Sequence, residues 1–92
     1  MRSLEEVLDA VNDRETFLEF VKCLAKDRMT EVDLEKETPS LPYGSGALGW
    51  ENGSIEMYLE AAVAWAEDSN TLTQVPSWRQ FAQFLYAGKG YE

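Results

Sequence analysis

The sequence predicts an all-α fold, a small single-domain helical bundle of three to four helices with one long Pro/Gly loop. Three observations predict it: apolar residues recur at helical spacing in several segments, capping residues precede these segments, and no convincing strand run is present. A chain of 92 residues has the usual size of one domain with one core. We therefore expect residues 1–92 to form a single helical domain.

The first predicted helix covers about residues 4–11. Ser3 followed by Glu6 has the spacing of a capping box, in which each side chain satisfies a backbone donor at a helix start. The apolar residues that follow at helical spacing are Leu4, Val7, Leu8 and Val11.

The second predicted helix covers about residues 14–28. Asn12 and Asp13 break the first pattern and supply a new cap. Its apolar residues are Phe17, Phe20, Val21 and Leu24. At 100° per residue Arg28 falls in the middle of this apolar face, so the helix is expected to end or bend near Asp27 unless Arg28 reaches outward to solvent.

A long loop over residues 38–53, rich in Pro and Gly, precedes the third predicted helix, residues 55–68. Ser54 is its cap, and its apolar arc consists of Ile55, Tyr58, Leu59, Ala62, Trp65 and Ala66. Its strong amphipathic pattern predicts burial of this arc.

The fourth predicted helix covers residues 78–87. Ser77 and Gln80 have capping-box spacing, and Gly88 is placed to end the helix. The expected buried stripe consists of Trp78, Phe81, Ala82 and Leu85. We expect the tail after Gly88 to return across the core.

The net charge of −9 limits the partners of the chain. Binding to nucleic acid requires Lys and Arg to neutralise phosphates, and anionic lipid repels an acidic protein. No apolar run approaches the length of about 20 residues that spans a bilayer. The charge and the missing apolar run therefore predict no nucleic-acid or membrane partner. One cysteine and no secretory pattern favour a cytoplasmic protein.

The composition also limits the chemistry. The chain has no histidine, which excludes Ser-His-Asp, Cys-His and His-metal arrangements. The single thiol, Cys23, is interpreted as structural, because the nearby Lys22 and Lys26 offer only exposed positive charge and no activating base. We therefore predict no catalytic residue, no metal site and no cofactor.

Glu56, Glu60 and Glu67 align on one face of the third helix, opposite its apolar arc. A solvated face is the simpler interpretation. The alternative is a recognition surface for a basic protein, because from Thr38 to Trp78 the chain has five acidic residues and no basic one.

Aromatic residues supply the remaining candidates. Tyr43 and Trp50 lie in the long loop, where an exposed ring would suggest partner binding, although Trp50 directly precedes a helix cap and can instead pack onto the core. Trp65 and Trp78 lie on apolar arcs and are expected in the core.

A combination of motifs covers most of the chain except residues 30–49. The motifs are Phe17-Leu18-Glu19-Phe20-Val21, Trp50-Glu51-Asn52, Ser54-Ile55-Glu56, Tyr58-Leu59-Glu60-Ala61, Trp65, Glu67-Asp68, Pro76-Ser77-Trp78, Phe81-Ala82 and the closing Lys89 with Tyr91-Glu92. The combined pattern resembles a family of small uncharacterised bacterial proteins catalogued as a domain of unknown function. The resemblance implies a cytoplasmic bacterial protein and carries over no catalytic residue.

The sequence leaves three functional hypotheses. The leading one is a non-enzymatic interaction module, similar to inhibitor or immunity proteins in charge and size, that presents an acidic helix face to a basic protein partner. The second is a small enzyme or metal-dependent protein that uses Glu51, Glu56 or Glu60, which the short chain disfavours because a pocket needs several hundred Å3. The third is a homodimer joined by the loop aromatics.

Overall fold

The computed structural model describes residues 2–38 and 48–91. These residues form four α-helices and no strand: α1 (Leu4–Asp9), α2 (Arg14–Glu37), α3 (Ile55–Ser69) and α4 (Trp78–Gly90). The predicted all-α fold is confirmed. Residues 39–47, which include most of the predicted loop and Tyr43, lie outside the described residues.

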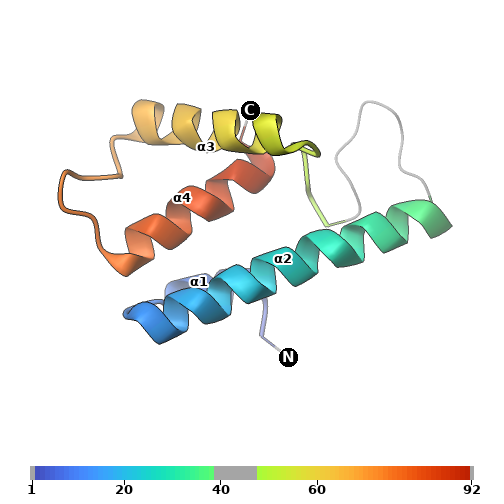
Figure 1. Ribbon diagram of the computed structural model, residues 1–92, viewed down its shortest axis with the longest axis horizontal. Helices are drawn as coiled ribbons and strands as arrows, with labels where there is room; N and C mark the ends of the chain where they lie inside the picture. Colours follow the sequence, from blue (N-terminus) through green and yellow to red (C-terminus); the bar gives the residue numbers. More distant parts are fainter. Residues whose placement is uncertain (1, 39–47, 92) are drawn as a thin grey trace.

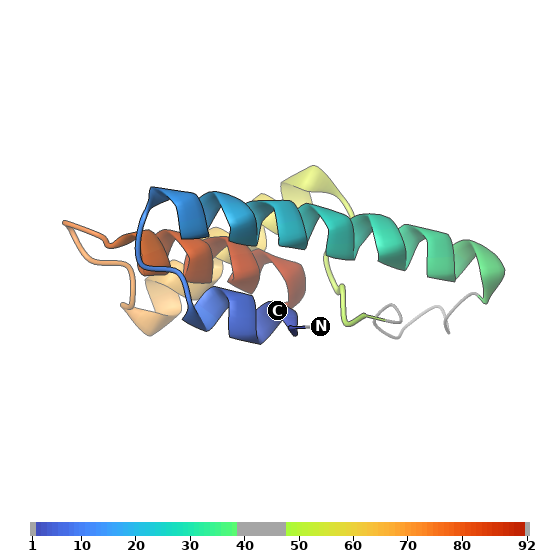
Figure 2. The ribbon, with the colours of Figure 1, turned by 90° about the horizontal axis from the view of Figure 1, so that it is seen from below.

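The helices are arranged around α4, which runs between α2 and α3 (Figure 1). α4 packs against each of the other three helices, and α1 also packs against α2 (Figure 2). Within the described residues, α2 and α3 do not pack against each other. α4 therefore separates two long helices whose facing sides remain apart.

All four helix starts coincide with the capping residues predicted from the sequence. The N-caps are Ser3, Asp13, Ser54 and Ser77. Each side chain accepts a hydrogen bond from the backbone N–H three residues later, which satisfies one of the donors left free at a helix start. At Asp13 and Ser77 the bond is reciprocal, so these two caps are full capping boxes.

The predicted ends of three helices are wrong. α1 ends at Asp9 rather than near Val11, although Val11 is still fully buried. α2 continues nine residues beyond the predicted end at Arg28. The Arg28 side chain remains about one-third exposed and pairs with Glu31 one turn later, so the guanidinium does not interrupt the helix.

Gly88 does not end α4, which continues to Gly90 instead of stopping at residue 87. Its role is close packing, because a Cβ at residue 88 would lie 2.7 Å from Tyr58 Cε1 and 2.8 Å from the Tyr58 carbonyl oxygen. Only glycine allows α3 and α4 to approach this closely. Residues 88–90 are therefore part of the helix rather than of a returning tail.

The central core joins α1, α2, α4 and the segment before α3. Its buried residues are Val7, Val11, Phe20, Leu24, Trp50 and Ala82. α3 buries Ala61 and Ala62. The core on the α2 side is therefore built from larger side chains than the buried positions of α3.

Two expectations about buried residues are wrong. Ile55 and Leu59 on the predicted buried arc of α3 are 77% and 49% exposed, because α3 packs only on α4 among the described helices and buries only the side facing it. Trp78 and Phe81 of the predicted buried stripe of α4 are 42% and 43% exposed, with their rings 6.4 Å apart. The Trp78 ring also lies 5.3 Å from that of Phe17.

Candidate functional site

The outer side of α3 carries the three carboxylates singled out in the sequence. Glu56, Glu60 and Glu67 are all exposed, and we call this surface the acidic face. In the part of the chain that the structure describes, no Lys or Arg lies within ion-pair distance of any of the three. The acidic face is thus negative, and no cation among residues 2–38 and 48–91 compensates it.

An apolar groove of about 390 Å3 lies beside the acidic face, between α2 and α3. Its apolar lining comes from Val21, Leu24 and Ala25 of α2, Ile55, Tyr58 and Leu59 of α3, and Leu85 of α4, with residues 50 and 52–54 at one end. We call it the α2–α3 groove. It exists because α4 separates α2 from α3, so that the two helices do not pack on each other within the described residues.

Ile55 and Leu59 connect the groove to the acidic face. Both line the groove and remain largely exposed, whereas Glu56 and Glu60 immediately follow them in the same helical turns. Residues separated by 100° around a helix axis lie on adjoining strips of its surface. One wall of the groove is therefore bordered by two carboxylates.

A buried carboxylate fixes the segment at the end of the groove. Glu31 is 1% exposed, and its Oε1 accepts hydrogen bonds from the backbone N–H groups of Leu48 at 3.0 Å and Trp50 at 3.2 Å. Its other oxygen, Oε2, accepts one from Arg28 Nη1 at 3.0 Å. Burying a carboxylate is costly unless it is paired and hydrogen-bonded, and both conditions are met here.

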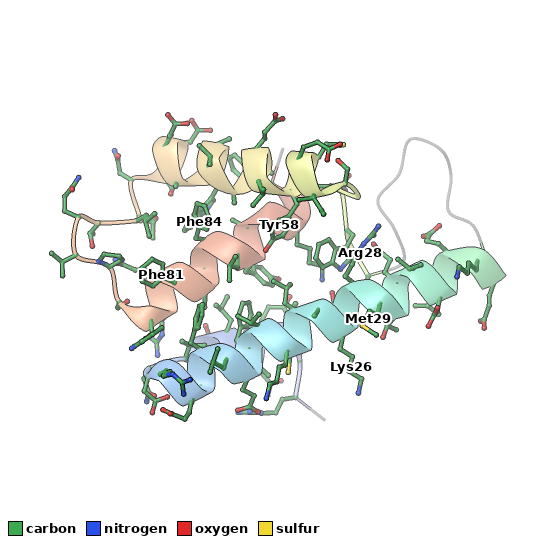
Figure 3. All side chains as sticks on the ribbon, viewed as in Figure 1. Lys26, Arg28, Met29, Tyr58, Phe81 and Phe84 are labelled. Atoms are coloured by element: carbon green, nitrogen blue, oxygen red, sulfur yellow. The ribbon has the colours of Figure 1, made fainter. Side chains whose placement is uncertain are left out.

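Arg28 links the same carboxylate to the chain just before α3. Its second nitrogen, Nη2, donates to the Gly53 carbonyl oxygen at 3.2 Å. Figure 3 shows Arg28 pointing from α2 towards this segment, whereas Lys26 points to the opposite side of the helix. Glu31 neutralises Arg28, so the positive charge at this end of the groove is already paired.

Trp50 is buried by contacts with α2, α3 and α4. Its indole Nε1 donates to Asp27 Oδ2 at 2.8 Å, and its ring stacks on that of Tyr58 at a centroid distance of 6.0 Å. Lys89 Nζ pairs with Asp27 at 2.8 Å and lies 5.8 Å from the centre of the Trp50 ring. With 8% of its surface exposed, Trp50 packs in the core and does not present its ring to a partner.

Tyr58 forms the floor of the groove where α3 meets α4, towards which it points in Figure 3. Its hydroxyl donates to the Leu85 carbonyl oxygen at 2.6 Å. Burial raises the pKa of Tyr58 to about 12. The phenol therefore stays protonated as a hydrogen-bond donor through the physiological pH range.

The structure brings together some of the residues chosen from the sequence. Glu56, Glu60 and Glu67 share one exposed face, Trp50 lies at the end of the neighbouring groove, and Tyr43 is outside the described residues. Sequence reasoning missed Glu31. The available signal was its spacing, because Glu31 follows Leu24 by seven residues and so falls on the buried side of a helix that continues beyond Arg28.

The described residues offer no sign of a metal centre or a membrane span. No three acidic, Cys or His side chains among them gather closely enough to hold a metal ion. Within residues 2–38 and 48–91, no helix combines the length and the apolar character needed to cross a bilayer.

Comparison with known proteins assigns the family but no activity. The model of a family of unknown function, DUF7660, matches residues 13–92, so the chain belongs to this family. The expectation that the chain belongs to an uncharacterised domain family is thereby confirmed. No curated protein and no solved structure matches the chain.

Proposed function

We propose that this member of the family is a non-enzymatic interaction module that binds a basic protein partner through the acidic face of α3. The observation that carries the proposal is the exposure of three carboxylates on one helix face without a cation beside them among the described residues. Such a surface attracts cationic proteins and speeds their encounter.

The charge of the whole chain supports the same class of partner. A net charge of −9 disfavours nucleic acid and anionic membranes, and it also disfavours a second copy of the chain at this face because like charges would oppose each other. The single cysteine and the family resemblance support a bacterial cytoplasmic setting.

The proposal is tested by neutralising the acidic face. Glu56, Glu60 and Glu67 are changed together to Gln, which retains similar helix propensity and removes only charge. The matched control is Glu15→Gln with Asp33→Asn and Glu37→Gln, which removes three exposed acidic charges from α2 instead.

Wild type and both variants are used to capture partners from the source cell, and the association kinetics of each recovered protein are measured at several salt concentrations. We expect the acidic-face variant to associate about tenfold more slowly at low salt and to lose most of the salt dependence. The control variant should retain the wild-type association rate and its salt dependence. Equal association rates for the two variants would show that the acidic face has no specific role.

A further inference from the structure

We propose that the α2–α3 groove is the binding site for an amphipathic helix of the partner. The apolar side chains of this helix would lie in the groove, and its Lys or Arg residues beside Glu56 and Glu60. This inference rests on the proposed function and adds where the partner binds and what shape it has. The groove presents Ile55 and Leu59 to solvent on a wall that no described helix covers.

The dimensions of the groove fit a short helical contact. Its α2 wall runs from Val21 to Arg28, which corresponds to about 10 Å at a rise of about 1.5 Å per residue. Two helical turns cover this length and place two or three apolar side chains, at i, i+3 or i+4 and i+7, along one line. A helix resting there would pack against α2, α3 and α4 together.

Backbone hydrogen bonding favours a helix over an extended peptide. The walls are helices, whose backbone N–H and C=O groups are already paired along their length, and the lining side chains are mostly apolar. An extended peptide would lose water from its own backbone groups and find few partners for them, at a cost in free energy for each. A helix satisfies these groups internally.

The charges around the groove determine which sign of charge the partner helix must carry. Arg28 is the cation in the lining, and it is paired with Glu31. Glu56 and Glu60 border the opposite wall without a cation within ion-pair distance among residues 2–38 and 48–91. Basic residues flanking the apolar row of the incoming helix would therefore meet unpaired carboxylates, whereas acidic ones would be repelled.

The test uses three synthetic 18-residue peptides as probes. The first places Leu at i, i+3, i+4 and i+7 with Lys elsewhere, the second replaces Lys by Glu, and the third scrambles the first so that its Leu residues share no helix face. Affinity is measured by titration calorimetry, and the site of binding is mapped by backbone amide chemical shifts of the full chain.

Two variants separate the groove from the rest of the surface. Ile55→Ser with Leu59→Ser removes the exposed apolar wall. Met57→Ser with Val75→Ser removes two exposed apolar residues that do not line the groove. Both variants must unfold at denaturant concentrations close to that of the wild type before their affinities are compared.

We expect the Lys peptide to shift amides of groove-lining residues and to bind the Ile55/Leu59 variant about tenfold or more weakly, with little change for the control variant. The Glu peptide and the scrambled peptide should bind at least tenfold more weakly than the Lys peptide. Unchanged affinity of the Ile55/Leu59 variant, or shifts located away from the groove, would overturn the inference.

The same measurements distinguish this inference from the proposed function. Binding that is weakened by neutralising Glu56, Glu60 and Glu67 but not by removing the apolar wall would leave the acidic face as a binding surface and exclude the groove. Equal binding of the Lys and Glu peptides would contradict the acidic face itself, and with it the basic helix proposed here.

Discussion

Single residues determine how the segment before α3 is attached to the bundle. Glu31 alone accepts hydrogen bonds from two backbone N–H groups of that segment while pairing with Arg28. The segment in turn brings Trp50 into the core and places Gly53 beside Arg28. One buried carboxylate therefore contributes three hydrogen bonds at the end of the α2–α3 groove, in addition to the bond from Trp50 to Asp27.

Replacing Glu31 by Ala should destabilise the fold by about 3–5 kcal/mol, because the change leaves the backbone N–H groups of Leu48 and Trp50 without their acceptor and Arg28 without its carboxylate partner. Glu31→Gln should cost less, since one amide oxygen can still accept hydrogen bonds. Denaturant unfolding measures the change, and Asp33→Asn, at an exposed position of the same helix, is the control. A loss for Glu31→Ala no greater than that of the control would contradict this role.

Tyr58 makes stability depend on pH in the alkaline range. Its pKa is raised from 10.0 to about 12 by burial, so the folded chain favours the neutral phenol that donates to Leu85. The stabilisation is complete below pH 10 and is lost as the pH rises through about 12. Tyr86, whose pKa burial and the hydrogen bond to Glu5 also raise to about 12, acts in the same direction.

We therefore expect the free energy of unfolding to fall between pH 10 and 12. Tyr58→Phe should lose about 1 kcal/mol at pH 7 through the missing hydrogen bond and show a smaller alkaline decrease. Tyr58→Phe with Tyr86→Phe should show a smaller decrease still. Urea unfolding at a series of pH values measures this, and an identical alkaline decrease in all three proteins would rule out these two phenols as its cause.

At the scale of helices, the contact between α3 and α4 depends on the absence of a side chain at residue 88. Gly88→Ala should cost about 1–3 kcal/mol, since the new methyl group meets the Tyr58 backbone and the helices must separate. Gly90→Ala is the matched control in the same helix, because its Cβ would lie 3.5 Å from the Gly49 carbonyl oxygen, an ordinary contact. Thermal unfolding should separate the two variants; a Gly88→Ala protein as stable as Gly90→Ala would disprove the close contact.

The helix starts were predictable and several helix ends were not, for a physical reason. A cap such as Ser54 or Ser77 acts on a donor three residues away, so the signal is contained in the local sequence. Past Arg28, α2 buries Glu31, whose partners include the backbone of Leu48, 17 residues away. The seven-residue spacing from Leu24 to Glu31 is a local signal, but the partner that makes burial of a carboxylate possible cannot be recognised from it.

The candidate site was predictable in its charge and not in its shape. The alignment of Glu56, Glu60 and Glu67 follows from helical spacing alone. The exposure of Ile55 and Leu59 follows from which helices pack on α3, and the apolar pattern of α3 indicates only that this side prefers burial. An apolar pattern of this kind is the same whether its residues are buried by their own chain or by a binding partner.

For the whole molecule, the excess of acidic charge should make stability depend on salt. The chain has 17 acidic and eight basic residues, and the exposed ion pairs Arg2–Glu19 and Arg14–Glu15 contribute little. Repulsion therefore dominates at low ionic strength, where screening is weak. Raising the salt concentration should increase the melting temperature until the repulsion is screened.

Neutralising the acidic face should have the same effect as salt. Glu56 and Glu60 are one helical turn apart, and a like-charge pair at this spacing costs about 0.2–0.5 kcal/mol. The Gln variant at Glu56, Glu60 and Glu67 should therefore be slightly more stable than wild type in low salt and equal to it near 0.5 M NaCl. Calorimetric melting across this range measures both effects. The prediction is contradicted if the melting temperature falls as salt is added, or if the Gln variant is less stable than wild type. Either result would mean that the carboxylates of α3 stabilise the folded chain. That stabilising role would explain their presence without a partner.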